Sequence, residues 1–122
     1  MSVGITLLGA TGSIGRSTLD VIARHPTRYH VVALTAQRDV AGMTALCAQH
    51  QPAYAVMADP DAAERLRRAL NDAAPEVNVL AGTNALEYVV TLPTTHTVMA
   101  AIVGAAGLLP TLAALPAEAK SP

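Results

Sequence analysis

The sequence has 122 residues, the size of one ordinary domain, so two catalytic domains do not fit. Hydrophobic residues make up 52% of it, but 25 of the 122 residues are alanine and there is no Phe or Trp. Eight basic and nine acidic residues give a formal net charge of −1. This balance excludes the basic field that a nucleic-acid backbone requires, and the scarcity of aromatic residues disfavours base stacking.

Neither cysteine nor histidine suggests a metal or disulfide framework. Cys47 is the single cysteine, which excludes an internal disulfide and a cysteine-based zinc site and fits a reducing, cytoplasmic location. It falls on the apolar side of an expected helix, as an inert core thiol. The four histidines show no metal-ligand spacing, and the N-terminus lacks the positive region of a secretory signal.

A long segment without charged residues, 88–117, raises the question of a membrane span. Three prolines and a polar run of Thr and His interrupt it, leaving only residues 98–109 as a continuous apolar part. That part is too short to cross a bilayer. We therefore expect a buried strand, a loop and a helix, with no membrane partner.

The first two elements are predicted on either side of a glycine-rich turn. Residues 3–8 form an apolar run that is typical of a strand buried on both faces. Residues 13–24 then read as a helix that ends before Pro26. One face of this helix is expected to carry its larger apolar side chains together with two small polar ones: Ile14, Val21, Ile22, Ser17 and Thr18.

The alternation of strand and helix then recurs to the end of the chain. Strands are predicted at residues 29–35, 54–57, 77–80 and 97–103, and helices at 40–50, 60–71, 84–90 and 108–115. Helix 40–50 presents one apolar face, with Val40, Met43, Leu46 and Cys47. This order predicts an α/β, Rossmann-like three-layer fold, with a mainly parallel sheet and helices on both faces.

Oppositely charged residues in helix 60–71 stand four apart, Asp61 with Arg65 and Glu64 with Arg68. Such pairs are typical of a solvated helix face. We interpret them as structural.

The strongest local signal is LGATGSIG at residues 8–15, directly between the first strand and the first helix. Its glycines permit a sharp turn and a close approach of the backbone to a ligand, and the amides that open the helix favour an anionic pyrophosphate. Thr11 and Ser13 add hydroxyl donors. The context favours a nucleotide-binding turn, and the alternative is a plain tight turn.

The end of the second strand bears on the choice between NADH and NADPH. No carboxylate stands at the tip of this strand, and Arg38 follows shortly after it. A guanidinium suits the 2′-phosphate of NADPH, whereas an acidic residue would select NADH. NADPH is favoured, and the alternative is that Arg38 only pairs with Asp39.

Two other catalytic templates are absent. Lys120 is the only lysine, so neither the phosphate-binding G-x-x-x-x-G-K-[ST] loop nor a Tyr-x-x-x-Lys pair occurs.

Residues 8–15, 17–21 and 98–112 resemble two signatures of the 1-deoxy-D-xylulose 5-phosphate reductoisomerase family. The resemblance implies an NADPH-dependent enzyme that rearranges and reduces 1-deoxy-D-xylulose 5-phosphate to 2-C-methyl-D-erythritol 4-phosphate in non-mevalonate isoprenoid synthesis. At residues 37–39 the family usually has Gly-Lys-Asn, of which only the positive charge is kept. The residues expected to bind the cofactor are Gly9, Thr11, Gly12, Ser13, Ile14, Gly15, Gln37, Arg38, Asp39, Ala101, Ile102 and Val103.

The resemblance extends to about residue 114, which bounds the expected NADPH-binding domain at 1–114. Residues 115–122 depart from the family's pattern, which continues into a lysine-containing strand and a set of carboxylate ligands for Mg²⁺ or Mn²⁺. We expect a disordered tail there, a truncated domain without catalytic residues or a metal site, and no turnover by the chain alone. The full-length family is expected to be homodimeric, and this chain to self-associate through exposed apolar surface.

Two alternatives to this function stay open. The chain is then either a non-enzymatic dinucleotide-binding or interaction module, or part of another NAD(P)-dependent Rossmann oxidoreductase.

Overall fold

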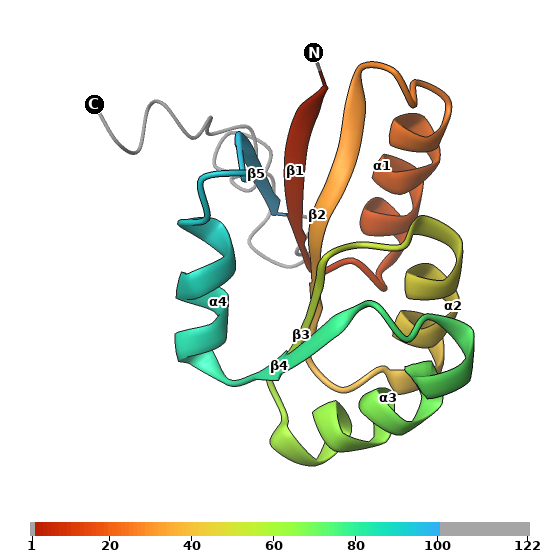
Figure 1. Ribbon diagram of the computed structural model, residues 1–122, viewed down its shortest axis with the longest axis vertical. Coiled ribbons are helices and arrows are strands. Elements are labelled where there is room, and N and C mark those ends of the chain that lie inside the picture. The colour runs from red at the N-terminus through yellow and green to blue at the C-terminus, as the bar shows by residue number, and fades with distance from the viewer. Residues whose placement is uncertain (1, 101–122) are drawn as a thin grey trace.

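A computed structural model describes residues 2–100 of the chain. Five parallel strands, joined by helices, form one sheet in the order β4-β3-β2-β1-β5. In Figure 1, three helices lie on one side of the sheet and α4 lies on the other, which confirms the predicted fold class. The elements are β1 (Val3–Leu8), α1 (Ser13–Ala23), β2 (Tyr29–Ala36), α2 (Val40–His50), β3 (Tyr54–Met57), α3 (Pro60–Ala73), β4 (Asn78–Ala81), α4 (Thr83–Val90) and β5 (Thr97–Ala100).

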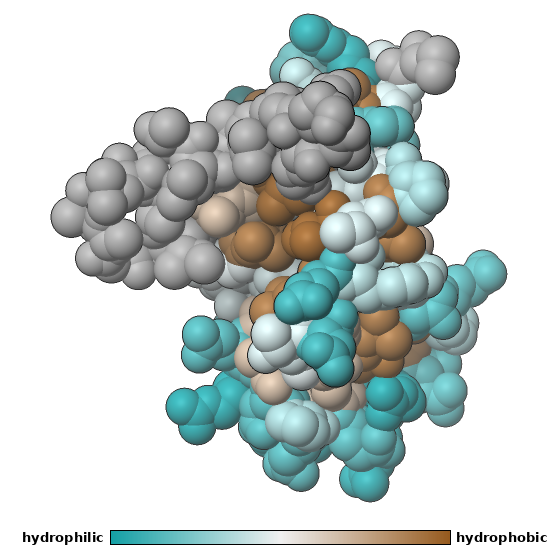
Figure 2. Space-filling model, turned by 90° about the vertical axis from the view of Figure 1, so that its left-hand side faces the viewer, coloured by the Kyte–Doolittle hydropathy of each residue, from teal (hydrophilic) through white to brown (hydrophobic). Residues whose placement is uncertain are grey.

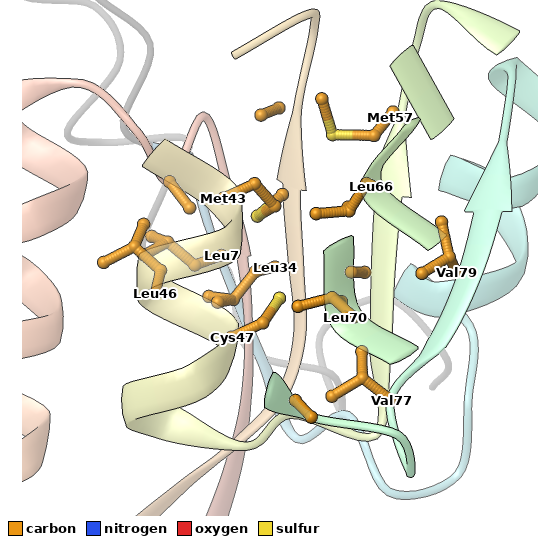
Figure 3. Close-up of a cluster of buried hydrophobic side chains, with 14 of the residues drawn as sticks. Leu7, Leu34, Met43, Leu46, Cys47, Met57, Leu66, Leu70, Val77 and Val79 are labelled. Atoms are coloured by element: carbon orange, nitrogen blue, oxygen red, sulfur yellow. The ribbon is translucent and has the colours of Figure 1, made fainter. Parts of the chain in front are cut away.

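The larger part of the core lies between the sheet and helices α1, α2 and α3. Leucine and methionine side chains from both layers interdigitate there, and Figure 3 shows them converging from β1, β2 and β3 on one side and from α2 and α3 on the other. The labelled members that are fully buried are Leu7, Leu34, Met43, Cys47, Met57, Leu66 and Leu70. This close packing of aliphatic side chains fills the core in the absence of Phe and Trp.

The opposite face of the sheet carries a smaller core under α4. Val32, Ala33 and Val56 from the sheet meet Ala85 and Val89 from the helix. Figure 2, which views this side of the molecule, shows hydrophobic surface in the middle of the face and hydrophilic surface below it. Among the described helices, α4 alone covers this face of the sheet.

Two aspartates begin helices at the ends of strands. The Asp39 carboxylate accepts a hydrogen bond from the Gly42 amide at 2.9 Å and caps α2, and Asp59 caps α3 immediately before Pro60. Both residues satisfy amides that have no partner within the helix. The predicted start of α3 is confirmed.

The predicted inward face of α1 is partly wrong. Ile14 and Val21 are each 51% exposed, whereas Gly15, Leu19 and Ile22 are buried. The helix turns Gly15 toward the sheet because that residue packs tightly against the preceding loop. Leu19 and Ile22 follow it at helical spacing on the buried face.

The bounds of β1, α2 and β3 match the prediction, and those of α1, β2, α3, β4 and α4 differ from it by one or two residues. β5 begins at Thr97 as predicted and runs to Ala100, the last described residue, and the predictions for residues 101–122 lie outside the described part of the chain. The two predicted charge pairs of α3 form at exposed positions, with Arg65 Nε 3.4 Å from Asp61 and Arg68 Nε 3.8 Å from Glu64.

Arg67 of the same helix protects the edge of the sheet. It pairs with Glu64, and its Nη2 donates to the Val79 carbonyl in the edge strand β4 at 3.0 Å. A carbonyl at the edge of a sheet that accepts a hydrogen bond from a charged side chain is less available to pair with another strand.

Residues 2–100 contain no helix that is both long enough and apolar enough to cross a membrane.

Candidate functional site

A cleft of about 440 Å³ opens where β1, β2 and β3 end. Ligands of parallel α/β sheets bind at this carboxyl end, near the point where the strand order reverses, which here lies between β1 and β5. The loop after β1, the loop after β2, Ala58 and α4 form the walls. The lining residues are Leu8, Gly9, Thr11, Gly12, Thr35, Ala36, Gln37, Arg38, Asp39, Ala58 and Leu86.

The first wall of the cleft is the glycine-rich loop, which the end of β2 holds in place. The Gly9 amide donates to Thr35 Oγ1 at 3.2 Å, and the Ala10 amide donates to the Thr35 carbonyl at 2.8 Å. Gly9 has a φ of 73°, in the left-handed region that favours glycine. Thr35 was not among the predicted site residues, because nothing in the strand pattern distinguishes it from its neighbours.

Gly15 lies beneath the loop and is required by packing. A Cβ at this position would stand 2.5 Å from the Ala10 carbonyl oxygen and 2.6 Å from that of Gly9. Both atoms belong to the backbone, so the loop itself would have to move. Gly15 therefore supports the cleft by letting α1 approach the end of β1.

Gly12 differs, because neither the backbone nor the packing requires a glycine there. Its φ of −76° suits any residue, and an added Cβ would meet no other atom closer than the Gly9 carbonyl oxygen at 3.9 Å. Gly12 is the N-cap of α1, and no side chain caps this helix, in contrast with α2 and α3. The space above Gly12 thus opens onto the cleft next to the uncapped N-terminus of α1, where an anion is favoured.

The second wall contains Gln37, Arg38 and Asp39, three of the residues that the sequence analysis expects to bind the cofactor. The Gln37 carbonyl accepts the Asp59 amide at 3.1 Å, and Asp39 caps α2. Among the described residues no ion pair joins Arg38 to Asp39. The alternative in which Arg38 only pairs with Asp39 is therefore not seen, and Arg38 lines the cleft.

The other predicted site residues lie elsewhere. Ser13 and Ile14, in the first turn of α1, line a separate hollow of about 320 Å³ on the outer face of that helix and are not among the residues that line the cleft. Ala101, Ile102 and Val103 lie outside the described residues.

Arg16 is a second residue that the sequence reasoning missed. Its Nε donates to the Thr11 carbonyl at 2.9 Å, and its Nη2 would be 2.8 Å from a Cβ added to Gly42. The side chain therefore reaches from the first turn of α1 to the first turn of α2 and lies close to both loops that line the cleft. Its position in an amphipathic helix gave no signal, because exposed arginines are common there.

The described residues form no candidate metal centre. Nowhere in residues 2–100 do three His, Cys, Asp or Glu side chains come together in a way that would hold a metal ion. Cys47 is buried in the core, and burial raises the pKa of its thiol to about 12. This confirms the interpretation of Cys47 as an inert core residue.

Comparison with known proteins gives one consistent result. The family model for 1-deoxy-D-xylulose 5-phosphate reductoisomerase matches residues 5–120. The enzyme of that name from Nitrosococcus oceani is 60% identical over 112 residues, and the one from Acidithiobacillus ferrooxidans is 54% identical over 121 residues. These matches cover 92% and 98% of this chain, but 28% and 31% of the relatives.

Solved structures agree with the sequence matches. The reductoisomerase from Zymomonas mobilis in complex with NADPH has a TM-score of 0.76 and 43% identity, over 93% of this chain and 29% of that one. A reductoisomerase in complex with magnesium gives a TM-score of 0.80 and 40% identity, over 96% of this chain and 29% of that one. The chain thus spans somewhat under a third of the length of these proteins, and it belongs to the 1-deoxy-D-xylulose 5-phosphate reductoisomerase family.

Proposed function

We propose that this chain provides the NADPH-binding part of a 1-deoxy-D-xylulose 5-phosphate reductoisomerase, the enzyme that rearranges and reduces that substrate to 2-C-methyl-D-erythritol 4-phosphate. The observation that carries the proposal is the open space above Gly12, at a position where the fold itself does not require a glycine. A relative in complex with NADPH and another in complex with NADPH, fosmidomycin and magnesium support the choice of cofactor.

The glycine-rich loop fits a pyrophosphate. The first turn of α1 has no side-chain cap, and the partial positive charge of a helix N-terminus favours an anion at that place. Gly9, Thr11 and Gly12 line the cleft beside it. We assign these three residues and the amides of Ser13, Ile14 and Gly15 to the pyrophosphate.

The loop after β2 fits the adenosine end of the cofactor. Arg38 lines the cleft without an ion-pair partner among the described residues, and it offers a planar set of donors to a phosphate. We assign Gln37, Arg38 and Asp39 to the 2′-phosphorylated ribose. Ala101, Ile102 and Val103 are proposed to lie near the nicotinamide.

NADPH supplies a hydride when it is bound, and this chain's residues are proposed to hold and orient it. The described residues contain no cluster of metal ligands, so the Mg²⁺ or Mn²⁺ of the whole enzyme is not assigned to them. We accordingly expect the chain by itself to bind cofactor without turnover. A reductoisomerase assay with substrate, NADPH and Mg²⁺ tests this, and any substrate-dependent oxidation of NADPH would contradict it.

The cofactor assignment is tested by titrating the chain with NADPH and with NADH and following the fluorescence of the reduced nicotinamide. We expect tighter binding of NADPH, and Arg38→Ala should remove this preference, with a loss of about tenfold or more for a charge-assisted contact to phosphate. If the chain responds to neither cofactor, the cofactor assignment is contradicted, and the alternative of a non-enzymatic interaction module is favoured. A preference for NADH would instead favour another Rossmann oxidoreductase.

Self-association is proposed from the exposed apolar surface. Ile14 and Val21 are each about half exposed on one face of α1, and apolar residues gather on the α4 side in Figure 2. Size-exclusion chromatography over a range of concentrations should show dimers or larger species, and a constant monomer would contradict the proposal. A homodimer is also proposed for the full-length enzyme, and a reducing cytoplasm as the location, which suits the free thiol of Cys47.

A further inference from the structure

We propose that Arg16 makes this cleft selective for a dinucleotide with a phosphate on its adenosine ribose, by offsetting the negative charge of Asp39. The inference rests on the proposed function and deepens it. Arg16 is a positioning residue here, because it acts on the two loops that form the walls of the cleft.

The geometry links Arg16 to both walls. Its Nε donates to the carbonyl of Thr11 in the glycine-rich loop at 2.9 Å. Its Nη2 lies 2.8 Å from the point where a Cβ of Gly42 would stand, and the Asp39 Oδ2 atom lies 2.4 Å from that same point. The guanidinium and the carboxylate thus approach each other across the space that the missing side chain of Gly42 leaves open.

Asp39 creates the electrostatic problem that Arg16 offsets. Its Oδ1 atom accepts the Gly42 amide at 2.9 Å, which fixes the carboxylate at the start of α2, and the residue lines the cleft next to Arg38. A fixed negative charge beside the proposed phosphate position repels a phosphate of nearly two negative charges. A guanidinium on the other side of the carboxylate reduces that repulsion.

Arg16 and Asp39 do not form a direct ion pair among the described residues, so no close ion pair neutralises the charge of Arg16. Arg24 differs from Arg16 in this respect, because it caps the far end of α1 and pairs with Asp20 at 2.7 Å. The simplest competing role for Arg16 is to hold the Thr11 loop only. If that is its only role, Arg16→Ala should weaken the binding of NADPH and of NADH equally. Charge compensation predicts instead that the binding of NADPH weakens more than that of NADH.

The experiment measures dissociation constants of NADPH and NADH for the wild-type chain and for Arg16→Ala, Arg16→Lys and the double variant Arg16→Ala/Asp39→Asn. We expect Arg16→Ala to weaken NADPH binding about fivefold and NADH binding less than about twofold, as for a solvent-exposed charge interaction. Arg16→Lys should retain most of the preference. The double variant should bind NADPH more tightly than Arg16→Ala does, because Asn caps a helix as well as Asp does without the charge.

Arg24→Ala is the matched control and should leave both constants unchanged, and thermal unfolding checks that every variant folds. An equal loss of NADPH and NADH binding in Arg16→Ala, no loss at all, or no recovery in the double variant would overturn the inference. If Arg38→Ala still abolishes the NADPH preference in those cases, the proposed function stands without it. A wild-type chain that binds neither cofactor would overturn both.

Discussion

The layer beneath α1, α2 and α3 and the cleft at the carboxyl end of the sheet are built in opposite ways. In the layer, large aliphatic side chains such as Leu34, Leu66 and Leu70 are buried and touch several neighbours. In the cleft, the chain runs through Gly9, Thr11 and Gly12, and the backbone itself forms much of the wall. One region is held together by its side chains, and the other is kept open by their absence.

This difference separates stability from binding. A side chain removed from the layer leaves a cavity, and a side chain added to the cleft fills space that belongs to a ligand. The two regions meet at Gly15, which lies in a helix of the layer and supports the loop of the cleft. Substitutions on either side of that boundary should therefore change different measured quantities.

The largest expected effect is on stability, from Leu66→Ala in α3. Leu66 is fully buried between α3 and the sheet, as Figure 3 shows, so the substitution leaves a cavity. We expect the free energy of unfolding to fall by roughly 2 to 5 kcal/mol, measured by urea denaturation. The neighbouring exposed substitution Arg65→Ala should change it by less than about 0.5 kcal/mol.

At the boundary, Gly15→Ala should be the next most damaging change. Its Cβ would stand 2.5 Å from a backbone oxygen, so either α1 or the loop must shift. We expect a loss of roughly 1 to 3 kcal/mol of unfolding free energy, together with weaker NADPH binding. Urea denaturation and cofactor titration of the same sample measure both quantities.

Gly12→Ala is the paired substitution inside the cleft. The new Cβ meets no protein atom closer than 3.9 Å, so we expect the free energy of unfolding to stay within about 0.5 kcal/mol of wild type. NADPH binding should nevertheless weaken by about tenfold or more, because the methyl group occupies the space assigned to the pyrophosphate. Unchanged binding in a folded Gly12→Ala chain would mean that the ligand does not approach this loop.

The arrangement of strands and helices was accessible from the sequence because burial leaves a periodic pattern. Helix 40–50 and strand 54–57 were placed at their observed bounds, since a buried strand or helix face repeats its apolar residues regularly. The face of α1 was misassigned because Gly15, which has no apolar side chain to count, turns toward the sheet. Close packing of a glycine is a tertiary property that the pattern does not record.

The cleft was only partly accessible, for a related reason. The glycine spacing and the cation after the second strand identified the two loops that line it. Thr35 and Arg16, which fasten those loops, were missed because their roles depend on hydrogen bonds to backbone atoms. Such bonds depend on three-dimensional proximity, and an ordinary threonine in a strand or arginine in a helix carries no mark of them.

The smallest expected effect concerns the end of α2 that lies farthest from the cleft. Burial lowers the pKa of His50 below its usual value of 6.5, so the folded chain binds this proton less well than the unfolded chain. Stability should therefore fall as the pH drops through about 6.5 and level off below the pKa of the folded state. The fall should be only a few tenths of a kcal/mol, because solvent screens a partly exposed side chain.

His50→Gln removes this titration, so urea denaturation of the variant and the wild type over the same pH series isolates its contribution. The difference between the two should grow toward acid pH in favour of the variant, and a difference of the opposite sign would mean that the C-terminal dipole of α2 outweighs burial. Asp39, which lines the cleft, caps the N-terminus of α2, and His50 is the last residue of this helix, so the same series tests whether a charge at the far end of α2 affects binding in the cleft. NADPH binding should be equal in both proteins at every pH, because a charge at the far end of the helix is screened from the cleft by salt.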